Sequence, residues 1–235
     1  MLSISSFRVC FLSDTGAIPP ESCIFAQLLN LTAVVVGATV YVRYRHVRET
    51  CMDRPKILIA NKVSLVLGLL AALGVSMVGN FQETNVLVVH LIGAILAFGI
   101  GTVYCWLTSA LSYKMCPSVS SRLTCHIRVL ISSFTSVAFI ITFTLDGIAK
   151  RYFHGNDPRK WYPSDGGWSE HLVSTVSEWL MAIAMLMFFL TFVGEFKSIH
   201  VGEPPLVIIV SESTSTNSHD SAASYGACRR TSVTA

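Results

Sequence analysis

Two ionisable side chains that could serve as acid and base, His90 and Glu178, lie inside long apolar runs of the sequence. If these runs cross a bilayer, a lone charge near its centre costs roughly 2.5–3.5 kcal/mol on insertion scales, so each side chain needs a partner or water. We therefore expect a direct His90–Glu178 pair or a shared polar cavity. Such a pair would either fix the register of two helices or take part in proton sensing or lipid-headgroup binding.

No motif of an established enzyme class accompanies these two residues. The sequence contains no P-loop, no HExxH metal motif, no nucleophile elbow and no dinucleotide fingerprint. The tripeptide DTG at residues 14–16 also occurs in aspartic proteases, but such an enzyme needs a second aspartate on a matching β-rich lobe, for which the chain has no segment. Cys116, Cys125 and His126 lack the fourth ligand and the short pair spacing of a zinc site. We therefore expect no catalytic residues, no metal and no cofactor.

Composition indicates an integral membrane protein. The 235 residues are 52% hydrophobic and only 13% charged, with a mean hydropathy of +0.57, whereas soluble domains carry about 25% charged residues. The apolar residues fall into runs close to the roughly 20 residues that a helix needs to cross a hydrocarbon core. The runs show neither the polar stripe of amphipathic core helices nor the alternation of barrel strands. We predict an all-α, polytopic transmembrane bundle with five spans, at about residues 24–42, 63–79, 86–107, 127–145 and 172–193.

The distribution of Lys and Arg predicts the orientation of these spans. Twelve of the 17 basic residues fall in the first connection, the third connection and the C-terminal tail, and five fall on the other side. The positive-inside rule places the richer side in the cytosol. We expect a lumenal or extracellular strip over residues 1–23, the bundle over 24–198 and a disordered cytosolic tail over 199–235, whose polar composition cannot support a core. Within the tail, Ser232 follows two arginines and weakly resembles a kinase site.

Basic residues close to the first span form a second candidate site. Each basic residue near an anionic membrane surface contributes about 1 kcal/mol of attraction. The residues either enforce topology or bind anionic phospholipids, including phosphoinositides. They are Arg43, Arg45, Arg48, Arg54 and Lys56.

Small residues spaced by four predict where the helices pack, because small side chains let helix backbones approach closely in lipid. Packing within the bundle is the first interpretation and homodimerisation through one of these seams is the second, so the oligomeric state stays open. The expected packing residues are Gly68, Ala72 and Ser76 in the second run and Gly93, Ala97 and Gly101 in the third.

Several short motifs, in order along the chain, resemble the DRAM family of damage-regulated autophagy modulators, which is grouped with the Frag and Sfk membrane proteins. They are SDTGAIPPESCIF from residue 13, VGNFQET from 78, LSYKM from 111, CHIRVLIS from 125, HLVSTVSEW from 171 and FFLTFVGEF from 188. The family pattern implies six transmembrane helices, with SDTG in the first lumenal loop. The first helix of that pattern is missing here, which leaves open a complete protein, a shortened isoform or a wrong start site.

The resemblance implies a lysosomal or endosomal multi-pass protein that regulates autophagy through partner or lipid interactions, with another endomembrane or the plasma membrane as alternative locations. A second hypothesis is a lipid-handling protein that binds or redistributes phospholipids or phosphoinositides, and a third is a small transporter or channel. The expected partners are the lipid bilayer, anionic phospholipids and autophagy or trafficking proteins, and nucleic acid is not expected.

Overall fold

The computed structural model describes residues 11–117, 119–155, 161–200 and 202. Five helices in these ranges are long and apolar enough to cross a membrane, which confirms the predicted all-α bundle with five apolar spans. Each helix is longer than its apolar run on at least one side. The predicted tail beyond residue 202 and its candidate phosphorylation site at Ser232 lie outside the described residues. The five spans are Glu21–Thr50, Pro55–Asn80, Leu87–Lys114, Arg122–Tyr152 and Trp168–Phe196.

The first two spans form a helical hairpin, with α1 at Glu21–Thr50 and α2 at Pro55–Asn80. Glu21 in the first turn of α1 is favourable because that end of a helix carries partial positive charge. The N–H of Cys51 caps the other end by donating to the Val47 carbonyl at 3.0 Å. Pro55 opens α2, where its missing N–H leaves no hydrogen bond unmade.

The third span is not a uniform α-helix. It runs through α3 at Leu87–Ala94, a π-helical turn η3 at Ile95–Ile100 and α4 at Gly101–Lys114. A π-helical turn inside an α-helix is rare and is often found at functional sites. Nothing in the apolar pattern of the sequence predicted this turn.

The last two spans are α5 at Arg122–Tyr152 and α6 at Trp168–Leu190, followed by the short α7 at Val193–Phe196. The Ser121 hydroxyl caps α5 by accepting the Thr124 N–H at 3.1 Å. Two glycines with positive φ, Gly166 and Gly167, precede α6, and a Cβ at Gly167 would lie 2.7 Å from the Ala149 carbonyl oxygen. The short 3₁₀ turns η2 and η4 lie at Ser13–Gly16 and Pro163–Asp165.

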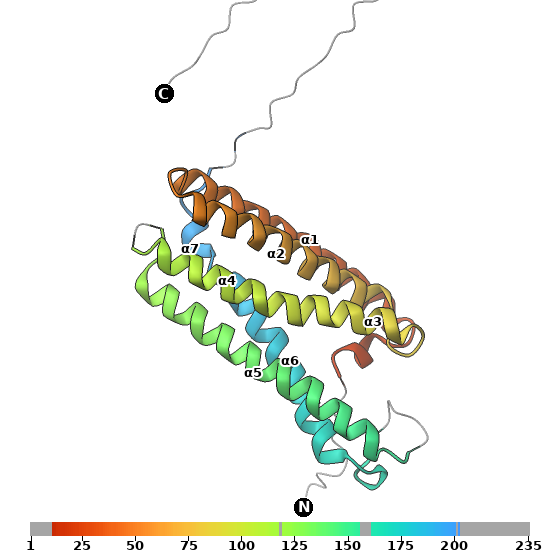
Figure 1. Cartoon of the computed structure of the whole chain (residues 1–235). Helices are drawn as coiled ribbons and strands as arrows, with labels where there is room; N and C mark the ends of the chain where they lie inside the picture. The colour runs from red at the N-terminus through yellow and green to blue at the C-terminus, as the bar shows by residue number, and fades with distance from the viewer. Residues whose placement is uncertain (1–10, 118, 156–160, 201, 203–235) are drawn as a thin grey trace, which may run out of the picture. The chain divides into compact units, whose positions relative to one another are not determined.

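Helices that follow one another in the chain pack side by side, α1 on α2, α2 on the third span, α4 on α5 and α5 on α6 (Figure 1). The contact between α2 and the third span is close, since a Cβ added to Gly74 would meet the Ala97 backbone nitrogen and lie 2.7 Å from the Gly93 carbonyl oxygen. Of the expected packing residues, Ser76 is partly buried and donates to Asn30 Oδ1 at 2.7 Å. The others are buried: Gly68, Ala72, Gly93, Ala97 and Gly101.

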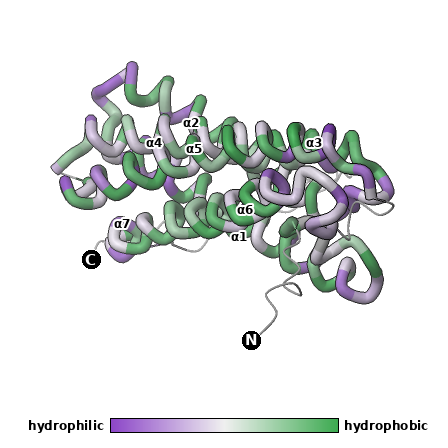
Figure 2. Tube along the Cα trace, turned by 90° about the horizontal axis from the view of Figure 1, so that it is seen from below, coloured by the Kyte–Doolittle hydropathy of each residue, from purple (hydrophilic) through white to green (hydrophobic). Residues whose placement is uncertain are grey.

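Hydropathy along the chain agrees with this arrangement. Apolar residues run along the helices, and many of the hydrophilic residues gather at turns and helix ends (Figure 2). Following the predicted orientation, we call the end of the bundle that holds the α2–α3 turn the lumenal end, and the end that holds the α1–α2 turn the cytosolic end.

Candidate functional site

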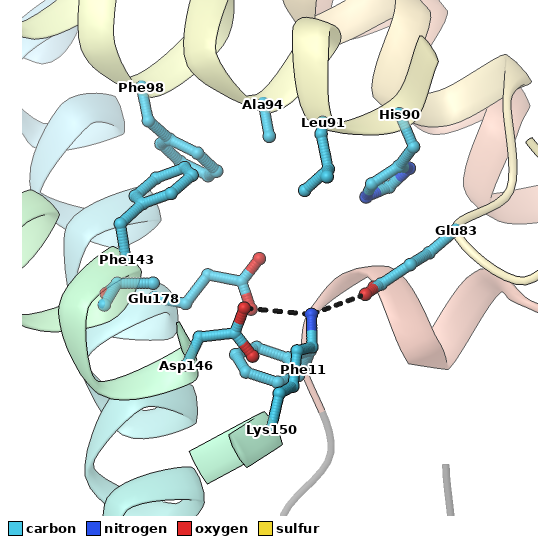
Figure 3. A pocket seen from close by; sticks show the side chains of 11 residues that line it. Phe11, Glu83, His90, Leu91, Ala94, Phe98, Phe143, Asp146, Lys150 and Glu178 are labelled. Carbon is cyan, nitrogen blue, oxygen red and sulfur yellow. Dashed lines mark ion pairs between the residues drawn. The ribbon is translucent and has the colours of Figure 1, made fainter. Parts of the chain in front are cut away.

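A small polar cavity of about 50 Å³ lies at the lumenal end of the bundle (Figure 3). Its lining comes from the N-terminal strip, the α2–α3 turn, the third span, α5 and α6. A polar site needs roughly 10–15 Å³ of such space to hold one water, so this cavity is large enough to hold water. The charged and ionisable residues on its wall are Glu83, His90, Asp146, Lys150 and Glu178.

Lys150 joins two of the carboxylates on this wall. Its Nζ lies 2.9 Å from Asp146 Oδ2, one turn earlier on α5, and 3.6 Å from Glu83 Oε1 on the α2–α3 turn (Figure 3). The second carboxylate oxygen of Asp146, Oδ1, is buried and makes no hydrogen bond among the described residues. We call Glu83, Asp146 and Lys150 the Lys150 cluster; it holds two carboxylates for one ammonium group.

The structure brings His90 and Glu178 to this same cavity, the second of the two arrangements that the sequence suggested. His90 Nδ1 lies 2.7 Å from the Phe81 carbonyl oxygen, so Nδ1 carries the proton and donates it. Glu178 Oε2 accepts the backbone N–H of Leu12 at 3.1 Å, which attaches the N-terminal strip to α6. The cavity therefore brings three carboxylates, one imidazole and one ammonium group together, but no group of His, Cys, Asp or Glu within the described ranges is arranged to hold a metal ion.

A second charged cluster, at the cytosolic end, is buried in the bundle. Glu195 of α7 lies between two arginines, with Oε2 2.6 Å from Arg43 Nη1 on α1 and Oε1 2.8 Å from Arg128 Nη1 on α5. The Ser120 hydroxyl donates to Glu195 Oε1 at 2.6 Å. The exposed fractions of the three charged side chains are 4% for Arg43, 0% for Arg128 and 6% for Glu195. We call these three residues the Glu195 cluster.

Neighbouring groups solvate the second arginine of the Glu195 cluster. Arg128 donates to the Ser112 hydroxyl at 2.7 Å from Nη1 and to the Thr191 hydroxyl at 2.9 Å from Nε. The Phe192 ring faces both guanidinium groups, with its centroid 4.4 Å from Arg128 Cζ and 5.5 Å from Arg43 Cζ. Such cation–π contacts favour a positive charge that has lost its water. The cluster therefore holds two cations with one carboxylate.

Arg43 was expected to contact anionic lipid, and the structure places it elsewhere. Its side chain points into the bundle and pairs with Glu195, so a lipid headgroup cannot reach it. The sequence placed Arg43 at the membrane edge of a basic loop, and proximity to the edge does not tell which helix face carries the residue. Glu195 received no role from the sequence, although it is a carboxylate within the last span.

The other basic residues of that candidate site are on the surface. Arg45 lies 3.4 Å from Glu49 on the next turn of α1, and Arg54 donates to the Lys114 carbonyl at 3.1 Å. Arg48 and Lys56 are exposed as well. Arg54 and Lys56 line an open depression that also contains Lys114. These residues carry their positive charge on the surface of the described part of the chain.

Comparison with known proteins agrees with this architecture. Residues 3–199 match the family described as the Frag1/DRAM/Sfk1/Cwh43P N-terminal domain. The chain is 38% identical to DNA damage-regulated autophagy modulator protein 2 of Bos taurus over 192 residues, which cover 80% of this chain and 72% of that protein. It is 41% identical to DNA damage-regulated autophagy modulator protein 1 of Homo sapiens over 195 residues, covering 80% and 78%.

A shorter match, 44% identical over 108 residues, joins 46% of this chain to 45% of the modulator of macroautophagy TMEM150B-B of Xenopus laevis. None of these three relatives is named as an enzyme. No solved structure matches the chain. The match to residues 3–199 and the identity to the two autophagy modulators together show that this chain belongs to the Frag1/DRAM/Sfk1 family of multi-pass membrane proteins.

Proposed function

We propose that this protein modulates autophagy from a lysosomal or endosomal membrane, through contacts that its cytosolic surface makes with partner proteins or lipids. The observation that carries the proposal is its 36–41% identity, over about 80% of the chain, to proteins named DNA damage-regulated autophagy modulators. The buried charges of the Glu195 cluster are engaged with one another, as in an ion-pair network that holds helices together.

Autophagic flux in cells that lack the protein tests this proposal. Flux is measured as the rise of the lipidated autophagosome marker when lysosomal degradation is blocked, with the tagged full chain re-expressed and located against a lysosomal marker. We expect removal of the protein to lower flux and re-expression to restore it. Unchanged flux in both cases, or a chain retained in the endoplasmic reticulum, would contradict the proposal.

The second candidate function is lipid handling through the exposed basic residues near the first connection. Arg45, Arg48, Arg54 and Lys56 are exposed on the side predicted to face the anionic cytosolic leaflet, and this observation favours the candidate. A change of charge at these positions should therefore weaken association with phosphoinositides while leaving the buried bundle intact.

Liposome flotation distinguishes this candidate from a role of the basic residues in topology alone. The purified full chain in nanodiscs is mixed with vesicles of phosphatidylcholine that do or do not contain phosphoinositide. The double variant Arg45→Glu and Arg48→Glu should lose the phosphoinositide-dependent fraction. The matched control Arg122→Glu and Lys197→Glu changes two other exposed basic residues by the same charge and should keep that fraction. Equal binding by wild type and both variants would exclude the candidate.

A further inference from the structure

A second cavity, of about 290 Å³, lies in the membrane-crossing part of the bundle and is almost entirely apolar. Four of the five spans contribute to it: α1, α2, the third span and α6. Small side chains form its inner wall, notably Ala71, Ala97 and Gly101. Two hydroxyl-bearing residues lie on its wall: the Thr32 hydroxyl donates to the Leu28 carbonyl of its own helix at 2.8 Å, and the Tyr104 hydroxyl is buried without a hydrogen bond among the described residues.

The cavity lies where the bundle is least closed. α1 packs mainly on α2, and α6 packs mainly on α5. Therefore α1 and α6, which lie on either side of the cavity, make little contact with each other. Two of the lining residues of α6, Ile183 and Leu186, remain 52% and 53% exposed, so this side of the cavity opens outward. In a membrane the medium outside that opening is hydrocarbon.

Polar contacts tie α1 and α6 together at the two ends of this opening. At the cytosolic end, Arg43 of α1 pairs with Glu195 of α7 at 2.6 Å. Toward the lumenal end, the strip that packs on α1 through η2 is attached to α6 by the Leu12–Glu178 hydrogen bond. Leu12 also lines the cavity. The opening is therefore bounded at both ends by specific contacts, while the stretch between them is lined by apolar side chains.

We propose that this cavity binds one acyl chain of a membrane phospholipid, which enters between α1 and α6. An apolar cavity of about half this volume stays dry in a soluble protein and takes up benzene, so an apolar occupant is favoured over water here. Lipid tails are as apolar as the cavity wall, so the hydrophobic effect does not drive binding. Binding is driven by van der Waals contact between the acyl chain and wall atoms that would otherwise face a void. An acyl chain is thin and flexible enough to enter, whereas a helix is about 10 Å across.

Photocrosslinking in lipid bilayers tests this proposal without reference to any role in autophagy. The purified full chain is reconstituted in nanodiscs of phosphatidylcholine, a fraction of which carries a diazirine on one acyl chain, and the labelled peptides are mapped by mass spectrometry. We expect labels on inner-wall residues such as Gly101 and Tyr104 as well as on the outer surface. Labels confined to exposed residues such as Ile140 would overturn the proposal.

Two tryptophan variants, one that fills the cavity and one on the outer surface, provide a matched comparison. Ala182→Trp adds bulk to the wall on α6, and Ile140→Trp adds an aromatic side chain to the outer face of α5, where the native residue is 63% exposed. Inner-wall labelling should be lost in the first variant and retained in the second. Inner-wall labelling that persists in a folded Ala182→Trp variant would contradict the proposal, and if that variant does not fold, the wild-type labelling pattern decides.

Two further outcomes concern other occupants. A diazirine fatty acid that labels the inner wall when the diazirine phospholipid does not would overturn the assignment to a phospholipid chain. A diazirine amino acid placed at Leu186 that crosslinks two copies of the protein, without inner-wall labelling by lipid, would also overturn the proposal and would show that a second copy covers the opening.

Discussion

The two charged clusters of this bundle are built from similar ion pairs but differ in packing and in excess charge. The Lys150 cluster holds two carboxylates with one ammonium group beside a polar cavity, and its lysine side chain is 44% exposed. The Glu195 cluster holds two guanidinium groups with one carboxylate, and each of its side chains is at most 6% exposed. A surface pair contributes little to stability, whereas loss of one partner from a buried pair leaves an unpaired charge.

This difference separates a fixed site from an adaptable one. The Glu195 cluster joins α1, α5 and α7 through groups that have no water to replace a lost partner, so it holds the helices in place. The Lys150 cluster joins α5 to the α2–α3 turn next to space for water, so its charges can be rearranged or protonated at a small cost. If the protein responds to the lumenal environment, the response is therefore expected at the Lys150 cluster.

The largest effect on stability is expected from Glu195→Gln. This substitution keeps the shape of the side chain but removes the charge that compensates Arg43 and Arg128, and loss of one partner of a buried ion pair typically costs about 3–5 kcal/mol. The free energy of unfolding, measured in nanodiscs or mild detergent, should fall by that amount. Glu49→Gln is the matched control, because Glu49 pairs with Arg45 at the surface and is 56% exposed, so its loss should cost far less than that of Glu195. Similar losses of unfolding free energy in the two variants would contradict the expected difference between a buried and a surface ion pair.

The two arginines of the Glu195 cluster should not be equivalent. Arg43→Met leaves a balanced pair of Arg128 and Glu195, so its cost should be lower than that of Glu195→Gln. Arg128→Met should cost more than Arg43→Met, because it also removes the donor to the hydroxyl and the carbonyl of Thr191. Thermal unfolding of the two variants measures the order, and a reversed order would show that Arg43 is the principal partner of Glu195.

Whether a feature of the fold or of the candidate site could be predicted from the sequence depends on how far apart in the chain the interacting residues lie. The five spans follow from the length and hydropathy of single segments, and His90 and Glu178 stand out because they are ionisable residues in apolar runs. The Glu195 cluster has no such local signal, since its pairs join residues 152 and 67 positions apart in the chain. Only the packing of α1, α5 and α7 decides that their polar faces meet.

The Lys150 cluster lies between these two cases. The apolar run ends near residue 145, but α5 continues to Tyr152, which places Asp146 and Lys150 one turn apart on the same face. Residues four apart on a helix are neighbours, so this pair could have been predicted once the helix was extended. Its contact with Glu83 could not, because the α2–α3 turn is placed by the close packing of Gly74 on the third span.

A smaller effect is expected from Lys150→Met. The variant loses the ion pairs with Asp146 and Glu83, but the lysine is 44% exposed and each carboxylate side chain is 21% exposed, so the free energy of unfolding should fall by about 1 kcal/mol, far less than in Glu195→Gln. Hydrogen exchange of the α2–α3 turn should increase, because its link to α5 is lost. Arg151→Met is the control, since it removes a neighbouring exposed cation that forms no ion pair among the described residues. A loss as large as that of Glu195→Gln would mean that the Lys150 cluster is as dry as the Glu195 cluster.

The smallest effect is expected from Glu178→Gln, and it separates the two roles considered for this residue. The amide oxygen of Gln can still accept the Leu12 N–H, so stability and the attachment of the N-terminal strip should change little, whereas Glu178→Ala removes the acceptor and should cost about 0.5–1.5 kcal/mol. Hydrogen exchange over residues 11–17 should therefore rise in the Ala variant only. If the carboxylate of Glu178 has a role beyond this hydrogen bond, Glu178→Gln should lower autophagic flux while leaving this exchange pattern intact. Autophagic flux that the substitution leaves unchanged would assign Glu178 to the attachment of the strip alone, because Gln keeps the acceptor for the Leu12 N–H and lacks only the carboxylate charge.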